Sequence, residues 1–246
     1  MEPGDILVVV GAFFFAALVK GITGLGFSTT ALPFIVYAIG LKEALPLLIL
    51  PSVVSNLIVM RDAGHFTATL MQFRLVYAAA PVGIFIGLAL LMWLDPAISS
   101  AILGLVLIIY CVIAITQPAF RLPTALARRL EIPVGFTTGL VNGVTGSQVM
   151  PVLPYLLSLQ LDRYVFIQAI NISFTISSGV FAIGLAWVGL FTFDTTQISF
   201  VGLVAMLVGL KLGIPIRRRL SQSSFRRAVL GLLMLLGAGL VLRPLL

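Results

Sequence analysis

The sequence predicts an all-α membrane protein of two inverted repeats. Each repeat would hold a glycine-broken re-entrant helix hairpin and three transmembrane helices, giving about 8–10 membrane segments. Three observations predict this: an apolar composition, an uneven distribution of arginine between loops, and a duplicated glycine motif. The 246-residue chain is 60% hydrophobic and 9% charged, whereas soluble domains carry about 25% charged residues. No soluble fold of this length can hide so much apolar surface, which excludes a globular enzyme, a nucleic-acid binder and a disordered chain.

The charge excess and the scarcity of cysteine and histidine narrow the possible functions. A formal net charge of +7 would suggest nucleic-acid binding in a soluble protein, but in a membrane protein it reports segment orientation. The single cysteine, Cys111, and the single histidine do not supply an intrachain disulfide or a multi-ligand zinc or haem site. We therefore expect no nucleic-acid partner, no metal and no cofactor.

Apolar runs define the membrane segments in order. A helix needs about 20 residues to cross the hydrocarbon core, and Ile6–Val19 and Pro133–Asn142 are short for that. Each is followed by a glycine-rich break and a second apolar piece, so each pair is either one long interrupted helix or a hairpin with arms of about 10–14 residues. The runs are Ile6–Val19, Gly21–Gly40, Ala44–Met60, Leu75–Leu94, Pro96–Ile115, Pro133–Leu161, Tyr164–Phe193, Ile198–Ile216 and Ala228–Leu242.

The positive-inside rule favours the hairpins. If each pair were one long helix, the positively charged residues would divide six against seven between the two sides of the membrane. If each pair is a hairpin, only Lys42 and Arg243 fall on one side and the arginines named below fall on the other. Both termini are then expected outside the plasma membrane of a bacterial cell, with the arginine-rich loops in the cytoplasm. The arginines gathered on that side are Arg61, Arg74, Arg121, Arg128, Arg129, Arg163, Arg217, Arg218, Arg219, Arg226 and Arg227.

The chain matches itself across a break in its apolar pattern. Gly21–Gly24 aligns with Gly143–Gly146, and the Gly-x-x-x-Gly pair Gly83 and Gly87 aligns with Gly209 and Gly213. The predicted division is residues 1–116, a cytoplasmic linker at 117–132, and residues 133–246. Three crossing helices per half is an odd number, so the second half is inserted upside down. Inverted repeats with broken helices are typical of secondary transporters that bind substrate near the midplane.

The duplicated motif resembles the TauE/SafE family. The motif is Gly21-Ile22-Thr23-Gly24-Leu25-Gly26 followed by Pro33 in one half, and Gly143-Val144-Thr145-Gly146 followed by Pro154 in the other. In the second copy, Ser147-Gln148 replaces Leu25-Gly26, so polar side chains take the place of a glycine. The resemblance implies a membrane transporter that exports sulfite, an organosulfur anion or a related small carboxylate.

The two breaks are the candidate substrate site. Glycine lets backbone N–H groups face inward, and the helix that follows directs its positive N-terminus to the same place. Such backbone at membrane depth is tolerated when it is buried in protein or lines a wet cavity. The candidate residues are Lys20, Gly21, Thr23, Gly24, Gly26, Ser28, Asn142, Gly143, Thr145, Gly146, Ser147, Gln148 and Asn171.

Several of these assignments have a plainer alternative. Small residues also permit close helix packing, which is the interpretation we prefer for Gly83, Gly87, Gly209 and Gly213. Lys20 either binds the anion or extends toward a water-filled cavity. Two polar stripes either line the path or tie helices together: Ser52, Ser55 and Asn56 in one half, and Asn171, Thr175 and Ser178 in the other.

The carboxylates bear on the mechanism by their position. All eight lie in termini, loops or segment ends, so no buried Asp or Glu is expected to relay protons. We therefore expect uniport, or coupling in which the substrate itself carries the proton. Alternating access would come from rocking of the two repeats. An enzyme is not expected, because no constellation of catalytic side chains stands at membrane depth. An anion channel with the same midplane site is the alternative.

Overall fold

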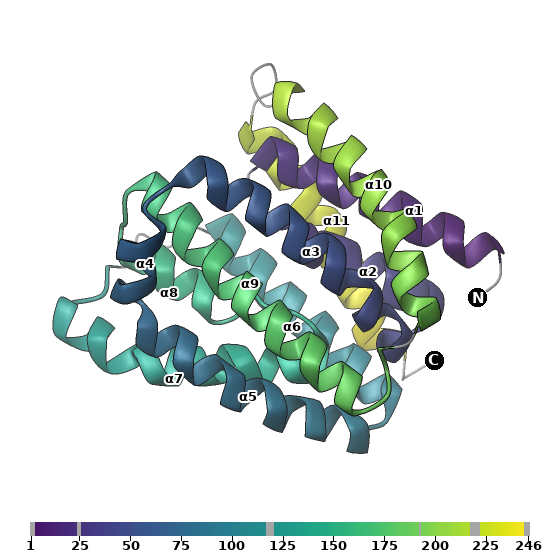
Figure 1. The fold of residues 1–246 in the computed structure, drawn as a ribbon, viewed down its shortest axis with the longest axis horizontal. Coiled ribbons are helices and arrows are strands. Elements are labelled where there is room, and N and C mark those ends of the chain that lie inside the picture. Colours follow the sequence, from purple (N-terminus) through teal and green to yellow (C-terminus); the bar gives the residue numbers. More distant parts are fainter. Residues whose placement is uncertain (1–2, 24–25, 117–120, 192, 217–221, 244–246) are drawn as a thin grey trace.

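The structure, a computed structural model, describes residues 3–23, 26–116, 121–191, 193–216 and 222–243. These residues form eleven helices and no strand, so the predicted all-α class is confirmed (Figure 1). The helices are α1 (Pro3–Thr23), α2 (Phe27–Ile39), α3 (Leu41–Ala63), α4 (Phe66–Gln72), α5 (Arg74–Trp93), α6 (Pro96–Thr116), α7 (Thr124–Thr145), α8 (Val152–Ser158), α9 (Arg163–Trp187), α10 (Phe193–Ile216) and α11 (Gln222–Leu242).

Six of these helices are long and apolar enough to cross a membrane. They are α1, α3, α5, α6, α9 and α10, with apolar stretches of 20 to 25 residues. At 1.5 Å per residue, such stretches span the roughly 30 Å hydrocarbon core. The 13-residue α2 is too short to cross. The protein is therefore a multi-pass helical membrane protein.

In the second half, the chain turns back on itself. The N–H of Leu122, just before α7, donates to the carbonyl of Ser158 at the end of α8 (3.2 Å). The Tyr155 hydroxyl likewise donates to the Ala127 carbonyl (3.1 Å). The end of α8 therefore lies beside the beginning of α7.

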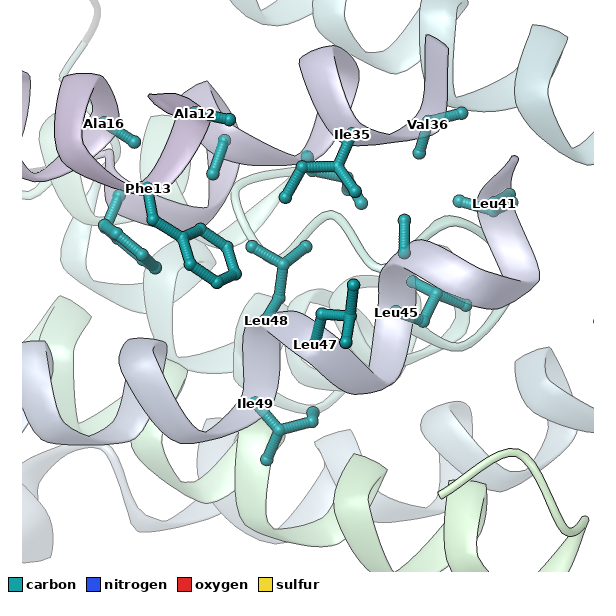
Figure 2. Packing of buried hydrophobic residues seen from close by; sticks show 14 of the residues in the cluster. Ala12, Phe13, Ala16, Ile35, Val36, Leu41, Leu45, Leu47, Leu48 and Ile49 are labelled. Atoms are coloured by element: carbon teal, nitrogen blue, oxygen red, sulfur yellow. The ribbon is translucent and has the colours of Figure 1, made fainter. Parts of the chain in front are cut away.

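In the first half, α2 packs back along α1, and α3 follows after a sharp turn at Gly40 (φ 90°). Phe15 and Phe34 meet edge to face, with ring centroids 5.8 Å apart. Figure 2 shows side chains from α1, α2 and α3, including Phe13, Ile35 and Leu48, pointing toward one another.

The first arms of the two turns are longer than the sequence indicated. We expected arms of 10 to 14 residues, but α1 has 21 and α7 has 22. α1 continues through Lys20 to Thr23, and α7 begins at Thr124, inside the region predicted as a linker. Charge interrupts the apolar pattern at Lys20, Arg128 and Arg129 without interrupting the helix, since Lys and Arg are good helix formers.

The closest helix pairs join the two halves of the chain. α1 packs along α10, α7 packs along α5, α3 contacts α9, and α6 contacts α11. In the two halves, α1 corresponds to α7, α3 to α9, α5 to α10 and α6 to α11. The α1–α10 pair therefore corresponds to the α7–α5 pair. The α3–α9 and α6–α11 pairs each join two corresponding helices.

Glycines make the two long pairs possible. A Cβ at Gly83 or Gly87 would overlap the carbonyl oxygens of α7, and a Cβ at Gly209 or Gly213 would overlap those of α1. Only a glycine lets two helix backbones approach so closely. The packing role that we preferred for these four glycines is confirmed.

A layer of buried polar residues separates two apolar clusters. Along α3, the buried apolar residues from Leu41 to Ile49 belong to one cluster and Met60 belongs to the other, with Ser52, Ser55 and Asn56 buried between them. Along α9, polar residues from Ser173 to Ser178 occupy the same place. The two chain breaks end in this polar layer.

Candidate functional site

A small closed cavity lies between the two breaks. Five predicted site residues line it: Lys20, Gly26, Ser28, Gln148 and Asn171. Its volume is about 10 Å³, close to what one water molecule needs. Further lining residues are Phe27, Thr29, Asn56 and Phe174. The cavity therefore brings together side chains from α1, α2, α3, the second break and α9.

Lys20 places a basic side chain in the wall of this cavity. The side chain is 3% exposed, and its Nζ donates to Ser55 Oγ (3.0 Å) and to Asn56 Oδ1 (2.6 Å). Both partners are neutral, although charged groups at membrane depth usually pair with an opposite charge. The hydrogen bonds hold Nζ in place but bring no countercharge to it.

The first break directs a helix N-terminus at the same cavity. Gly26 takes the left-handed conformation (φ 91°) that begins α2, and no side chain among the described residues caps that helix. The first turn, Phe27 to Thr29, lines the cavity together with Gly26. The first N–H groups of a helix have no partner within it and carry the positive end of its dipole. Ser28 Oγ is hydrogen-bonded to Ser52 Oγ (2.6 Å), which ties this turn to α3.

The second break is built differently. Gly146 ends α7 in the left-handed conformation (φ 75°), and the Ser147 N–H donates to Thr145 Oγ1 (3.1 Å). The Val152 N–H, at the start of α8, donates to Thr138 Oγ1 (3.0 Å). Gln148 lines the cavity and donates from Nε2 to Ser178 Oγ (2.8 Å) on α9. This break therefore reaches the cavity through Gln148, whereas the first break reaches it through Gly26 and the first turn of α2.

Other predicted site residues lie outside the cavity lining. Gly21 packs against Gly213, and Gly143 packs against Gly87, each with almost no space for a Cβ. A Cβ on Gly146 would overlap Leu45.

The polar candidates among them are buried or line a neighbouring cavity. Asn142, Thr145 and Ser147 are at most 1% exposed. Both amide atoms of Asn142 and the Ser147 hydroxyl have no hydrogen-bond partner among the described residues. Thr23 lines a neighbouring larger cavity. Gly24 lies outside the described residues.

Two residues of the polar layer were left undecided by the sequence. Ser55 and Asn56 belong to a stripe whose role we left open between lining the path and tying helices together. The structure makes both of them partners of Lys20. Their helical spacing indicated a shared face, but not that this face meets Lys20.

Two larger cavities adjoin the central one. One, of about 230 Å³, shares Gly26 and Thr29 with it and extends to Arg226. The other, of about 240 Å³, shares Lys20 and extends to Arg163. These arginines stand near the beginnings of α11 and α9. Both larger cavities therefore run from the central cavity toward arginine-bearing helix ends.

A family model, Sulfite exporter TauE/SafE, matches residues 9–240, which is nearly the whole chain. The chain belongs to the TauE/SafE sulfite exporter family. The resemblance drawn from the two glycine motifs is thereby confirmed. Comparisons with curated proteins and with solved structures gave no match. TauE/SafE proteins are membrane transporters, so the cavity around Lys20 is the place to look for a substrate.

Proposed function

We propose that this TauE/SafE protein is a secondary transporter that exports a small anion of the sulfite or sulfonate type across the plasma membrane. The anion binds in the central cavity, between the two glycine-rich breaks. The observation that carries this proposal is the buried Lys20 ammonium, whose two hydrogen-bond partners are neutral. An anion beside Lys20 would supply the missing countercharge.

The surroundings of Lys20 suit an oxyanion. The uncapped first turn of α2 offers N–H groups and a positive dipole end, a combination that favours anions. Gln148 and the hydroxyls of Ser28 and Thr29 add neutral polar groups. Phe27 and Phe174 form the apolar part of the wall. This mixture of one cation, backbone donors and apolar surface fits a small organosulfur anion as well as sulfite.

The shape of the path supports a carrier that works by alternating access. At about 10 Å³ the cavity is too small for sulfite, so this arrangement is an occluded one, and binding requires it to open. The two larger cavities offer approaches from the arginine-bearing ends. The apolar cluster containing Phe13, Leu45 and Leu48 closes the opposite side. A conducting channel needs a continuous polar path instead.

We further propose that the two halves are inverted repeats and that both breaks are re-entrant. The exchange of helix pairs between the halves and the return of α8 to the start of α7 support this topology. The arginine-bearing ends then face the cytoplasm, both termini lie outside, and the anion enters from the arginine side.

Anion efflux from proteoliposomes tests the proposal. Lys20→Gln keeps a polar side chain of similar but shorter reach and removes its charge, so sulfite efflux should fall at least about tenfold, the equivalent of about 1.4 kcal/mol. Lys211→Gln is the matched control, because Lys211 is exposed on α10 and lines none of the three cavities described above. Undiminished efflux through Lys20→Gln would contradict the proposal.

Carrier and channel differ in the number of ions moved per event. A carrier should exchange labelled sulfite for unlabelled sulfite across the vesicle membrane and give no unitary currents in a bilayer recording. Discrete current steps would favour the channel instead. Repeating the flux with and without a pH gradient separates simple uniport from coupling in which the substrate itself carries a proton.

A further inference from the structure

One polar atom in the wall of the central cavity has no partner. Asn171 on α9 is fully buried and lines the cavity together with Lys20. Its Nδ2 donates to the carbonyl of Ile167 (2.7 Å). Its Oδ1 has no hydrogen-bond partner among the described residues.

The orientation of this amide follows from its neighbour. Amide oxygen and nitrogen are assigned from the hydrogen bonds around them. A carbonyl can only accept, so the group that faces Ile167 must be the nitrogen. The oxygen is therefore the free atom, and it is an acceptor without a donor. Leaving such an atom unpaired typically costs about 1–3 kcal/mol.

Three other polar side chains of the wall already have partners. Gln148 donates from its amide nitrogen to Ser178, the Ser28 hydroxyl is bonded to Ser52, and Lys20 donates to Ser55 and Asn56. The cavity has room for about one water molecule, so it must open to admit an anion. The bound anion then takes the place of the water that could otherwise satisfy Asn171.

We infer that Asn171 selects anions that carry their own hydrogen-bond donor. This inference rests on the proposed function and concerns the same site. An anion with an O–H or N–H group beside its acidic group can offer its charge to Lys20 and its hydrogen to Asn171 Oδ1. An anion without such a hydrogen leaves the buried oxygen unpaired and close to negative charge. The preferred class is therefore hydrogen-bearing monoanions such as hydrogensulfite or amino-substituted sulfonic acids.

Sulfamate and methanesulfonate form a suitable pair of probes. Both are monoanions at neutral pH with a tetrahedral sulfonate group of similar size. They differ in an NH₂ group against a CH₃ group, so only sulfamate can donate to Asn171. We expect the purified full-length protein to bind sulfamate at least about tenfold more tightly, as measured by calorimetry or ligand-induced thermal shift.

Asn171→Leu assigns the preference to this residue. The substitution keeps the branched shape of the side chain and removes the acceptor, so the ratio of the two affinities should fall to about one. Ser99→Ala is the control, because the Ser99 hydroxyl on α6 is also buried and without a partner among the described residues but does not line the cavity. It should leave the ratio unchanged.

The outcomes separate this inference from the proposed function. Equal binding of both probes to the unmodified protein overturns the selection by Asn171, and so does a preference that survives in Asn171→Leu. Neither result touches the anion site itself. Failure of sulfamate to bind also overturns the inference, and sulfite binding measured alongside shows whether the site at Lys20 fails with it. The comparison in the unmodified protein stands even if Asn171→Leu does not fold.

Discussion

At the first break, the position before the glycine motif is Lys20, whose ammonium has two buried hydrogen-bond partners. At the second break, the aligned position is Asn142, whose amide has none among the described residues. The glycines that follow behave alike, since Gly21 packs against Gly213 and Gly143 against Gly87. The two halves therefore share a way of packing helices and differ in the polar chemistry beside it.

Under the proposed inverted-repeat arrangement, this difference gives a single asymmetric site. The charge and the open helix N-terminus come from the first half, whereas the second half contributes the amide side chains of Gln148 and Asn171. The first half would bind the acidic group of an anion in the cavity, and the second half would contact the rest of the anion.

The largest expected effect is a loss of stability when the tightly packed glycine at either break is replaced. Gly143→Leu and Gly21→Leu each force a side chain into a facing helix backbone, so both should lose about 3 kcal/mol or more of stability. Yield of monodisperse protein and thermal unfolding in detergent measure this loss. Gly231→Leu is the control, because nothing lies within 4 Å of a Cβ there. Unchanged stability in either of the first two variants would refute the packing role.

Exchanging Lys20 and Asn142 tests whether only the first break contributes to sulfite binding at this aligned position. Lys20→Asn should weaken sulfite binding at least about tenfold, or about 1.4 kcal/mol. The double variant Lys20→Asn/Asn142→Lys should not restore binding, because Asn142 does not line the cavity. Calorimetric titration with sulfite decides between the outcomes. Restored affinity in the double variant would place both positions in one site.

Replacing Asn142 should raise the stability of the protein, a smaller effect than those above. Asn142→Leu replaces two unpartnered buried polar atoms with an isosteric apolar group, which should stabilise the protein by about 1–2 kcal/mol. Asn56→Leu should do the reverse, because it removes a partner of Lys20. Thermal unfolding of both variants under the same conditions tests the contrast. A destabilised Asn142→Leu that also binds sulfite weakly would return Asn142 to the substrate site.

The smallest expected effect is a difference in stability between alanine variants of Ser28 and Ser147. Ser28→Ala loses the hydrogen bond to Ser52 and should lower stability by about 0.5–1.5 kcal/mol. Ser147→Ala removes a hydroxyl that has no partner among the described residues, so it should be neutral or slightly stabilising. Equal losses in the two variants would mean that Ser147 has a partner of its own.

Much of the fold could be read from the sequence, because the constraints behind it are local. Apolar runs, a Gly-x-x-x-Gly spacing and a break after Thr23 or Thr145 depend on neighbouring residues, and the helices and their glycine contacts follow them. The length of the first arms was misjudged, because a charge ends an apolar run without ending a helix. The helix pairs α1–α10 and α5–α7 cross between halves, which no local pattern reports.

The site could be predicted only in part, for a related reason. The spacing of Ser55 and Asn56 indicated one helix face, but the direction of that face depends on how α3 packs against α1. Lys20 precedes Gly21 as Asn142 precedes Gly143, so the two positions align, and both were candidate site residues. A two-fold arrangement puts aligned residues at equivalent positions around an axis, and equivalent positions need not touch one ligand. Asn142 therefore lies outside the cavity that Lys20 lines.

The contact between α1 and α10 also bears on how the protein is made. Gly213, the partner of Gly21 in this contact, is synthesised long after it. Until then, the glycine face of α1 has no α10 to pack against, so lipid, another protein or another part of the chain covers it. A variant that lacks α10 should therefore lose the packing beside the first break, although Lys20 and its partners Ser55 and Asn56 all stand earlier in the chain.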